Sequence, residues 1–223
     1  ELYSLQNDEG KRHQYAYTRI HQERSSRVNT YTFTFDGKLV RNTLQLVLDG
    51  EGIESHMFGL YLVSGDTIAD NHTVVDHRKP NSFSNEIYKG VLDGNSKGVF
   101  NGKIYVRPQA QKTNAFQANR NIVLSDNATV NTKPQLEIWA DDVKCSHGCT
   151  TGQLDEEAIF YLQARGIDKE TARAMMLFAF SIEIINNIKH EGLRHHIEGI
   201  IRSKLHQGNK VVRKLTAGMT TDK

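Results

Sequence analysis

Cysteine, net charge and long apolar runs are all scarce in this chain of 223 residues. Two Cys residues are too few for a disulfide-stapled secreted scaffold, and they fit a reducing compartment such as the cytoplasm. Lys and Arg number 28 against 26 Asp and Glu, so we expect no nucleic-acid footprint. The longest nearly continuous apolar stretch, residues 174–180, is far shorter than a membrane span, so no membrane contact is expected.

Several common functional motifs are also missing from the sequence. The Gly- and Lys-containing segment at residues 93–98 lacks Walker spacing, and no G-x-S-x-G nucleophile motif occurs. Residues 1–19 are mostly polar, carry no secretory signal and do not begin with Met. We therefore expect a globular portion of a longer chain, in which this polar segment precedes the folded core.

Residues 20–150 have the texture of a β domain. Short apolar or β-branched runs alternate with turn dipeptides, and no helical period survives for more than a turn. The runs cover residues 30–35, 44–48, 60–63, 73–75, 98–106, 122–124 and 136–139, and the turn dipeptides are Asp36-Gly37, Asp49-Gly50, Asp93-Gly94 and Asn101-Gly102.

The spacing of these runs bears on how the strands pack. The later runs recur every 15 to 20 residues, with polar corners such as residues 109–121 between them. Closely spaced hairpins would indicate a sandwich or barrel, whereas this wider spacing suits the stacked rungs of a parallel β-helix. Because the repeat is irregular, periodicity alone leaves both architectures open.

From residue 151 the pattern becomes helical. Asp155 and Asp168 are suitable N-caps for helices over residues 156–165 and 169–190, and Gly166 suits a helix C-terminus. A third helix is expected over residues 193–205. The tail, residues 207–223, has little apolar content, and we expect it to be mobile.

The densest group of metal-binding residue types is Cys145-Ser146-His147-Gly148-Cys149, at the junction of the two regions. Thiolate and imidazole suit zinc, copper(I) or iron–sulfur chemistry. In an extended strand Cys145 and His147 share one face. They form at most half of a metal site, and the simpler alternative is a buried Cys beside a hydrogen-bonded His.

Other polar residues have plain structural explanations. His72 and His77 flank a short apolar run beside Asp residues, and we interpret them as surface histidines at the ends of a strand rather than as metal or base residues. Asp141-Asp142 and residues 155–157 could form the paired acids of a hydrolase, but negative charge at a helix start explains the second group better.

A series of short motifs resembles the SufB/SufD family of the SUF iron–sulfur cluster assembly machinery. The resemblance covers roughly residues 20 to 206, and the run ADDVKCSHG is specific to the SufD branch of that family. The motifs in chain order are YKGV (88–91), GVFNGKI (98–104), QKT (111–113), LS (124–125), TKPQLEI (132–138), ADDVKCSHG (140–148), GQLD (152–155), FYL (160–162) and RGI (165–167).

This resemblance implies a mainly β fold, a right-handed parallel β-helix followed by a small C-terminal helical subdomain. It implies a non-enzymatic scaffold that pairs with a SufB-like paralogue, with Cys145 and His147 at the interface where a transient iron–sulfur cluster forms and no cofactor held stably by the isolated chain. It also implies a dock for a SufC-like ATPase in residues 151–206. We assign to this dock the residues Leu154, Phe160, Tyr161, Met175, Met176, Phe178 and Phe180.

Two alternatives stay open. One is a homodimeric β-helix scaffold with no metal role, since open strand edges invite pairing. The other is a carbohydrate-active β-helix enzyme, which would need a line of acids in one groove.

Overall fold

The computed structural model describes residues 1–8 and 12–206, which fall in two compact units. The strand unit spans Glu1–Gly152, and the helical unit begins at Gln153. The predicted mobile tail, residues 207–223, lies outside the described residues.

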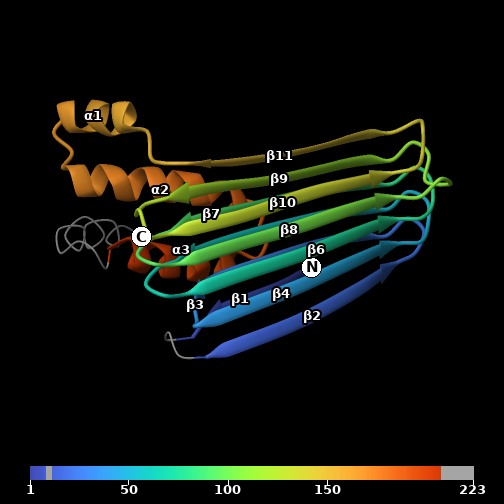
Figure 1. Cartoon of the computed structure of the whole chain (residues 1–223), viewed down its shortest axis with the longest axis horizontal. Coiled ribbons are helices and arrows are strands. Elements are labelled where there is room, and N and C mark those ends of the chain that lie inside the picture. The colour runs from blue at the N-terminus through green and yellow to red at the C-terminus, as the bar shows by residue number, and fades with distance from the viewer. Residues whose placement is uncertain (9–11, 207–223) are drawn as a thin grey trace. The chain divides into compact units, whose positions relative to one another are not determined.

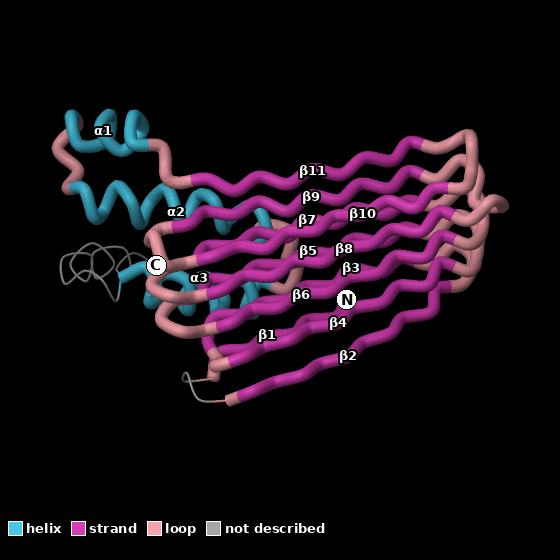
Figure 2. Tube along the Cα trace, viewed as in Figure 1, coloured by secondary structure: helices cyan, strands magenta, loops and turns pink. Residues whose placement is uncertain are grey.

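The strand unit consists of two parallel sheets, and successive strands alternate between them (Figures 1 and 2). One sheet has the order β1-β3-β5-β7-β9-β11, and the other has the order β10-β8-β6-β4-β2. The strands are β1 (Leu2–Asn7), β2 (His13–Gln22), β3 (Arg27–Asp36), β4 (Leu39–Leu48), β5 (Glu54–Val63), β6 (Ile68–His77), β7 (Phe83–Leu92), β8 (Lys97–Val106), β9 (Asn114–Val123), β10 (Thr129–Ile138) and β11 (Lys144–Gly152).

The alternation of strands makes a β-helix of about five turns. Glu54 pairs with Phe83, and Phe83 pairs in turn with Asn114, so each turn takes about thirty residues. All of the pairings between described strands are parallel, which confirms the predicted solenoid and excludes the hairpin-built sandwich.

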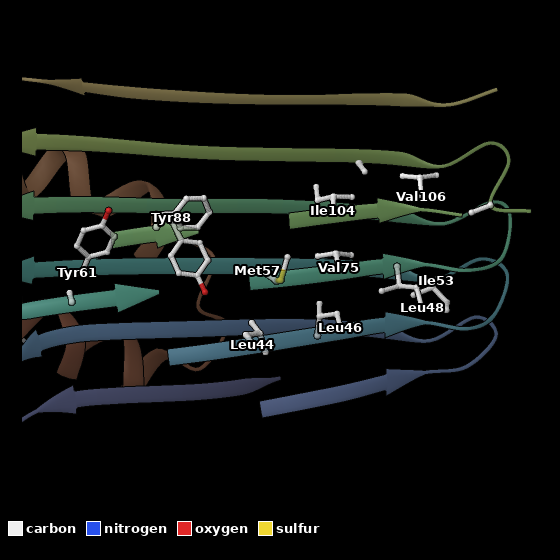
Figure 3. Packing of buried hydrophobic residues seen from close by; sticks show 14 of the residues in the cluster. Leu44, Leu46, Leu48, Ile53, Met57, Tyr61, Val75, Tyr88, Ile104 and Val106 are labelled. Carbon is white, nitrogen blue, oxygen red and sulfur yellow. The ribbon is translucent and has the colours of Figure 1, made fainter. Parts of the chain in front are cut away.

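The apolar core lies between the two sheets, where inward side chains of equivalent positions stack from turn to turn (Figure 3). Leu46, Val75 and Ile104 form one such row on β4, β6 and β8, and each is completely buried. A strand of period two contributes every second residue to this core, so short apolar runs are sufficient.

Two tyrosines interlock with two glycines on the neighbouring strand. Gly59 on β5 pairs with Tyr88 on β7, and Tyr61 pairs with Gly90. A Cβ on either glycine would overlap the ring of the opposite tyrosine. The glycines are therefore required by close packing, which leaves room for two buried aromatic rings in adjacent turns.

The interior also contains a polar region centred on β9. Tyr61 donates a hydrogen bond to Asn121 Oδ1, and Asn121 Nδ2 donates to Asn119 Oδ1 at 2.7 Å. Gln117 Nε2 donates to Glu86 Oε2 at 2.7 Å. All five side chains are at most 3% exposed, so these mutual hydrogen bonds replace the water that the groups lose on burial.

Two predictions for this region were wrong. Much of the predicted corner at residues 109–121 is strand β9, whose inward amides are accommodated by the polar network. The predicted turn at Asn101-Gly102 lies within β8, where Gly102 faces inward and a Cβ would overlap the Gln117 amide nitrogen. A buried polar strand has the composition of a loop, so composition alone misassigned it.

Both boundaries of the strand region differ from the prediction. The solenoid begins with β1 and β2, before residue 20, because their inward positions extend the rows of β3 and β4. At the other end the strand unit closes at Gly152, two residues beyond the predicted 150.

Three helices follow in the helical unit: α1 (Glu156–Ala164), α2 (Lys169–Ile185) and α3 (Glu191–His206). The predicted caps are confirmed, because Asp155 Oδ1 accepts from the amide of Glu157 at 2.9 Å and Asp168 Oδ1 from that of Thr171 at 2.9 Å. Gly166 follows α1 with a φ of 87°. Within this unit α1 packs on α2 and α2 on α3. No helix of the described residues is long and apolar enough to cross a membrane.

The tyrosine–glycine interlock predicts an asymmetry between two glycine substitutions. We expect Gly59→Ala to lower the free energy of unfolding by about 2 kcal/mol, because the new methyl group displaces the Tyr88 ring from a close-packed core. Gly148→Ala is the control, since a Cβ at that strand position meets no atom within 4 Å. Urea unfolding measures both, and equal stabilities would contradict the interlock.

Glu86 predicts a pH dependence of stability. Burial raises the pKa of Glu86 from 4.5 to about 7, although the hydrogen bond from Gln117 acts in the opposite direction. The unfolded chain releases the proton first, so this group's stabilisation is complete below about pH 4.5 and is lost as pH rises to about 7, by roughly 3 kcal/mol.

Glu86→Gln removes this titration, so its stability relative to the native chain should rise between pH 4.5 and 7. The difference between the two urea-unfolding curves isolates Glu86, because the contribution of His77, which acts in the opposite sense, is common to both chains and cancels. Burial lowers the pKa of His77 from 6.5 to about 4, which reduces stability as pH falls through that window. A difference that is independent of pH would contradict the assignment.

Candidate functional site

Strand β11 carries the predicted site and forms the last edge of the six-stranded sheet (Figure 1). It pairs with β9, so that Cys145 lies beside Ala115 and His147 beside Gln117. Ala115 and Gln117 belong to the inward, buried set of β9. Cys145 and His147 therefore share the inward face, as the alternation predicted, but at the open end of the solenoid.

Burial decreases along this face of β11. Cys145 is partly buried against the core cluster, whereas His147 and Cys149 are exposed. Burial raises the pKa of the Cys145 thiol, and a backbone hydrogen bond with Ala115 opposes this effect. The thiol is therefore kept protonated until a metal or a base displaces the proton.

The spacing of these side chains determines which of them can act together. Inward positions two apart on a strand are separated by roughly 7 Å, so Cys145 and His147 can reach one iron or one small cluster. Cys149 is the third member of the same face; it lies roughly 13 Å from Cys145, too far to share a single ion with it, but roughly 7 Å from His147. The sequence pattern by itself assigns no role to Cys149.

The pair is an incomplete ligand set. Among residues 1–8 and 12–206, no group of three or more His, Cys, Asp or Glu side chains could hold a metal ion. A four-coordinate iron or cluster site at Cys145 and His147 consequently needs further ligands from another molecule.

The two other candidate histidines occupy different surroundings. His72 Nε2 lies 2.8 Å from Asp70 Oδ1 on the outer face of β6, and its side chain is 25% exposed. His77 was predicted at the surface, and this was wrong: it is fully buried, with Nε2 2.8 Å from Ser84 Oγ. As the last inward residue of β6, it stacks in a row with Leu48 and Val106.

The acidic candidates do not line a groove. Asp141 and Asp142 are exposed in the bend before β11, and the backbone amide of Asp142 donates to Gln111 Oε1 at 2.9 Å. Asp155 caps α1, and Glu156 lies 3.8 Å from the Lys169 ammonium. These positions favour structural roles over the paired acids of a carbohydrate-active enzyme.

The seven predicted docking residues divide by exposure. Phe160, Tyr161 and Met175 are 72%, 57% and 47% exposed. Met176, Phe178 and Phe180 are partly buried, and Leu154 is buried. Of the seven predicted docking residues, only these first three present a mainly exposed apolar side chain to solvent.

Sequence reasoning missed the polar side chains that adjoin the site. Gln117 and Asn119 are the β9 neighbours of His147 and Cys149, and both are buried. The alternation of Gln117, Asn119 and Asn121 at every second position was the available signal, but it was interpreted as a corner.

Comparisons with known proteins point to a single family. Residues 1–180 match the family model of the SufBD core domain of SUF-system FeS cluster assembly. An iron–sulfur cluster assembly SufBD family protein of Synechocystis is 38% identical over 82% of this chain and 40% of its own length. The iron–sulfur cluster assembly protein SufD of Escherichia coli is 34% identical over 88% of this chain and 46% of its own length.

The SufD protein of Bacillus subtilis is 30% identical over 73% of this chain and 40% of its own length. The chain thus spans less than half the length of these relatives. The matched region contains the β-helix and its terminal strand, on which Cys145 and His147 lie. The chain belongs to the SufBD core family of the SUF iron–sulfur cluster assembly system and is a SufD-type protein.

Proposed function

We propose that this chain is the part of a SufD-type scaffold that contributes Cys145 and His147 to a subunit interface where an iron–sulfur cluster is assembled. The observation that carries the proposal is the position of both side chains on the inward face of the terminal edge strand. A partner seated on the open end would meet them directly and would supply the missing ligands.

The cluster is the cargo of such a scaffold, and the incomplete site is suited to that role. A pair of ligands binds iron and sulfide less firmly than a complete set, so the assembled cluster can be passed on. The raised pKa of Cys145 has the same consequence, because reprotonation of the thiol competes with the metal. No step of bond-breaking catalysis is assigned to this chain.

The open end also determines what kind of partner fits. Strands β10 and β11 are the terminal strands of the two sheets, so both have an unpaired edge among the described strands. A second parallel β-helix, such as a SufB-like paralogue, would continue both sheets by edge pairing. A second copy of this chain would have the same geometry, and the test below distinguishes the two.

We propose further that the helical unit docks a SufC-like ATPase through its exposed apolar side chains. Phe160 and Tyr161 are neighbours on α1, and the Arg165 guanidinium lies 4.5 Å from the centre of the Tyr161 ring. Exposed aromatic residues beside an arginine have the composition of an interface anchor.

We also propose that the chain works in the cytoplasm, where its two free thiols would stay reduced.

Cysteine substitutions test the cluster site. In a complex purified with SufB-like and SufC-like proteins, Cys145→Ser should lower bound iron and acid-labile sulfide by more than about tenfold, and His147→Ala should also lower them. Cys149→Ser is the matched comparison: Cys149 lies roughly 13 Å from Cys145 and outside the proposed pair, so both should stay unchanged, and a loss of either would add Cys149 to the ligand set. The visible absorption of the cluster provides an independent measurement.

An undiminished cluster yield in Cys145→Ser would remove the thiol from the site. If the chain copurifies with itself alone and binds no iron in any variant, the homodimeric scaffold without a metal role becomes the better description. Sedimentation of the mixed proteins identifies which complex forms.

Exposed helix residues test the dock. The double variant Phe160→Ser and Met175→Ser should weaken binding of the SufC-like ATPase by about tenfold or more, because both side chains are exposed and their loss removes apolar contact area. Gln163→Ser is the control, because Gln163 is an exposed polar residue on α1, the helix that carries Phe160. Titration calorimetry gives the affinities, and equal values would place the dock elsewhere.

A further inference from the structure

One corner of the strand unit carries a column of outward side chains that ends in the only tryptophan of the chain. Asp49, Arg78, Arg107 and Trp139 each follow directly after the last residue of β4, β6, β8 and β10. The backbone amides of the last three donate to the carbonyl at the end of the preceding strand in the same sheet, so the parallel register continues through the corner. Because β10 is the terminal strand of its sheet among the described strands, Trp139 is the last member of this column.

The indole of Trp139 is held by contacts with the preceding turns. The Arg107 guanidinium lies 5.3 Å from the centre of the Trp139 ring and 4.9 Å from that of Tyr105, and the two rings are 6.0 Å apart and inclined by 3°. Arg107 Nε donates in turn to Asp76 Oδ1 at 2.7 Å. The indole is therefore preorganised, although 48% of its surface is exposed.

Ile138, the residue before this tryptophan, shows what the open end lacks. Leu48, His77 and Val106 occupy the equivalent inward position in the preceding turns, and all three are completely buried. Ile138 continues their row on β10 but is 40% exposed. Adjacent strands lie about 4.8 Å apart, so a further strand paired with β10 would cover Ile138 and contact the indole beside it.

The charged groups next to the tryptophan in the chain are acidic. Asp141 and Asp142 are exposed in the bend before β11, and neither carboxylate forms an ion pair with any residue that the structure describes. Lys103, by contrast, is paired with Glu137 at 3.1 Å. Two carboxylates within three residues of an exposed indole complement a partner that carries a cation.

We propose that Trp139 is an anchor for the partner subunit at the open end, and that the partner places a lysine or arginine side chain on it. The methylene stem of that side chain packs on the exposed part of the indole, and its charged head reaches the carboxylates of Asp141 and Asp142. The partner is a second β-helix whose edge strand pairs with β10, since this arrangement continues both the backbone ladder and the outward column. The contact rests on the proposed function, because it belongs to the interface at β10 and β11.

A single fluorine label reports on this contact. With 5-fluorotryptophan in place of tryptophan, the chain has one ¹⁹F resonance, at Trp139, which an unlabelled partner does not obscure. In the chain alone this resonance should move between H₂O and D₂O, because the indole is exposed. Addition of the SufB-like protein should shift the resonance and abolish its solvent-isotope effect, whereas the SufC-like ATPase alone should change neither.

The outcomes separate this contact from the proposed function. A complex that sediments as such while the resonance keeps its solvent-isotope effect would overturn the contact and leave the proposed interface intact. Absence of any complex would overturn both. A change that appears when the chain alone is concentrated would assign this face to a second copy and overturn the contact. A lost isotope effect with an undiminished cluster in Cys145→Ser supports the contact and contradicts the role of the thiol.

Removal of the indole tests its share of the binding energy. Trp139→Ala should weaken binding of the SufB-like protein by about tenfold or more. Tyr15→Ala is the matched control, because Tyr15 is 68% exposed on β2, at the opposite edge of the same sheet. Urea unfolding verifies that both chains are folded, and titration calorimetry gives the affinities. Equal affinities would overturn the proposal.

The carboxylates test the charge of the partner and do not depend on the folding of Trp139→Ala. The double variant Asp141→Asn and Asp142→Asn should weaken binding by about fivefold at low salt, with a smaller difference at high salt, because salt screens exposed ion pairs. The double variant Glu51→Gln and Asp66→Asn is the control, since it removes the same charge from exposed turns far from β10. An equal loss of affinity in both double variants, or no loss in either, would overturn the cationic contact.

Discussion

In-register parallel pairing is the constraint on which the rest of this structure depends. Each turn places its inward side chains beside the equivalent side chains of the turn before, so the interior is a set of rows rather than a set of isolated contacts. The stacked side chains of one row must therefore fit one another in size and polarity along the whole solenoid. Leu46, Val75 and Ile104 satisfy this condition with apolar groups, and Glu86 and Gln117 satisfy it with a hydrogen bond.

The same constraint explains why the candidate site lies where the solenoid stops. Every inner turn completes its rows with a following turn, but β11 has no neighbour beyond it among the described strands. Cys145 and His147 occupy inward positions that an inner turn would bury. Their partial exposure is therefore a property of the open end, and a partner that covers this end would also bury the two ligands.

The helical unit depends on local sequence signals rather than on pairing between turns. Its helices begin at aspartate caps and are organised by local signals, so their starts are determined within a few residues of sequence. Leu177, Ser181 and Ile184 lie on the buried face of α2, whereas Phe160, Tyr161 and Met175 are exposed. The proposed docking role would account for this exposure, which folding of the unit does not require.

The sequence alone determined the strand texture, the change to helix near residue 150, the two helix caps and the shared face of Cys145 and His147. All of these depend on periods and caps that span a few residues. It could not determine the polar strand β9, the burial of His77 or the inward role of Gly102, because each depends on side chains about thirty residues away in the next turn. Only the tertiary structure decided which turn lies beside which, and so which polar groups find partners inside and which ligands are left at the edge.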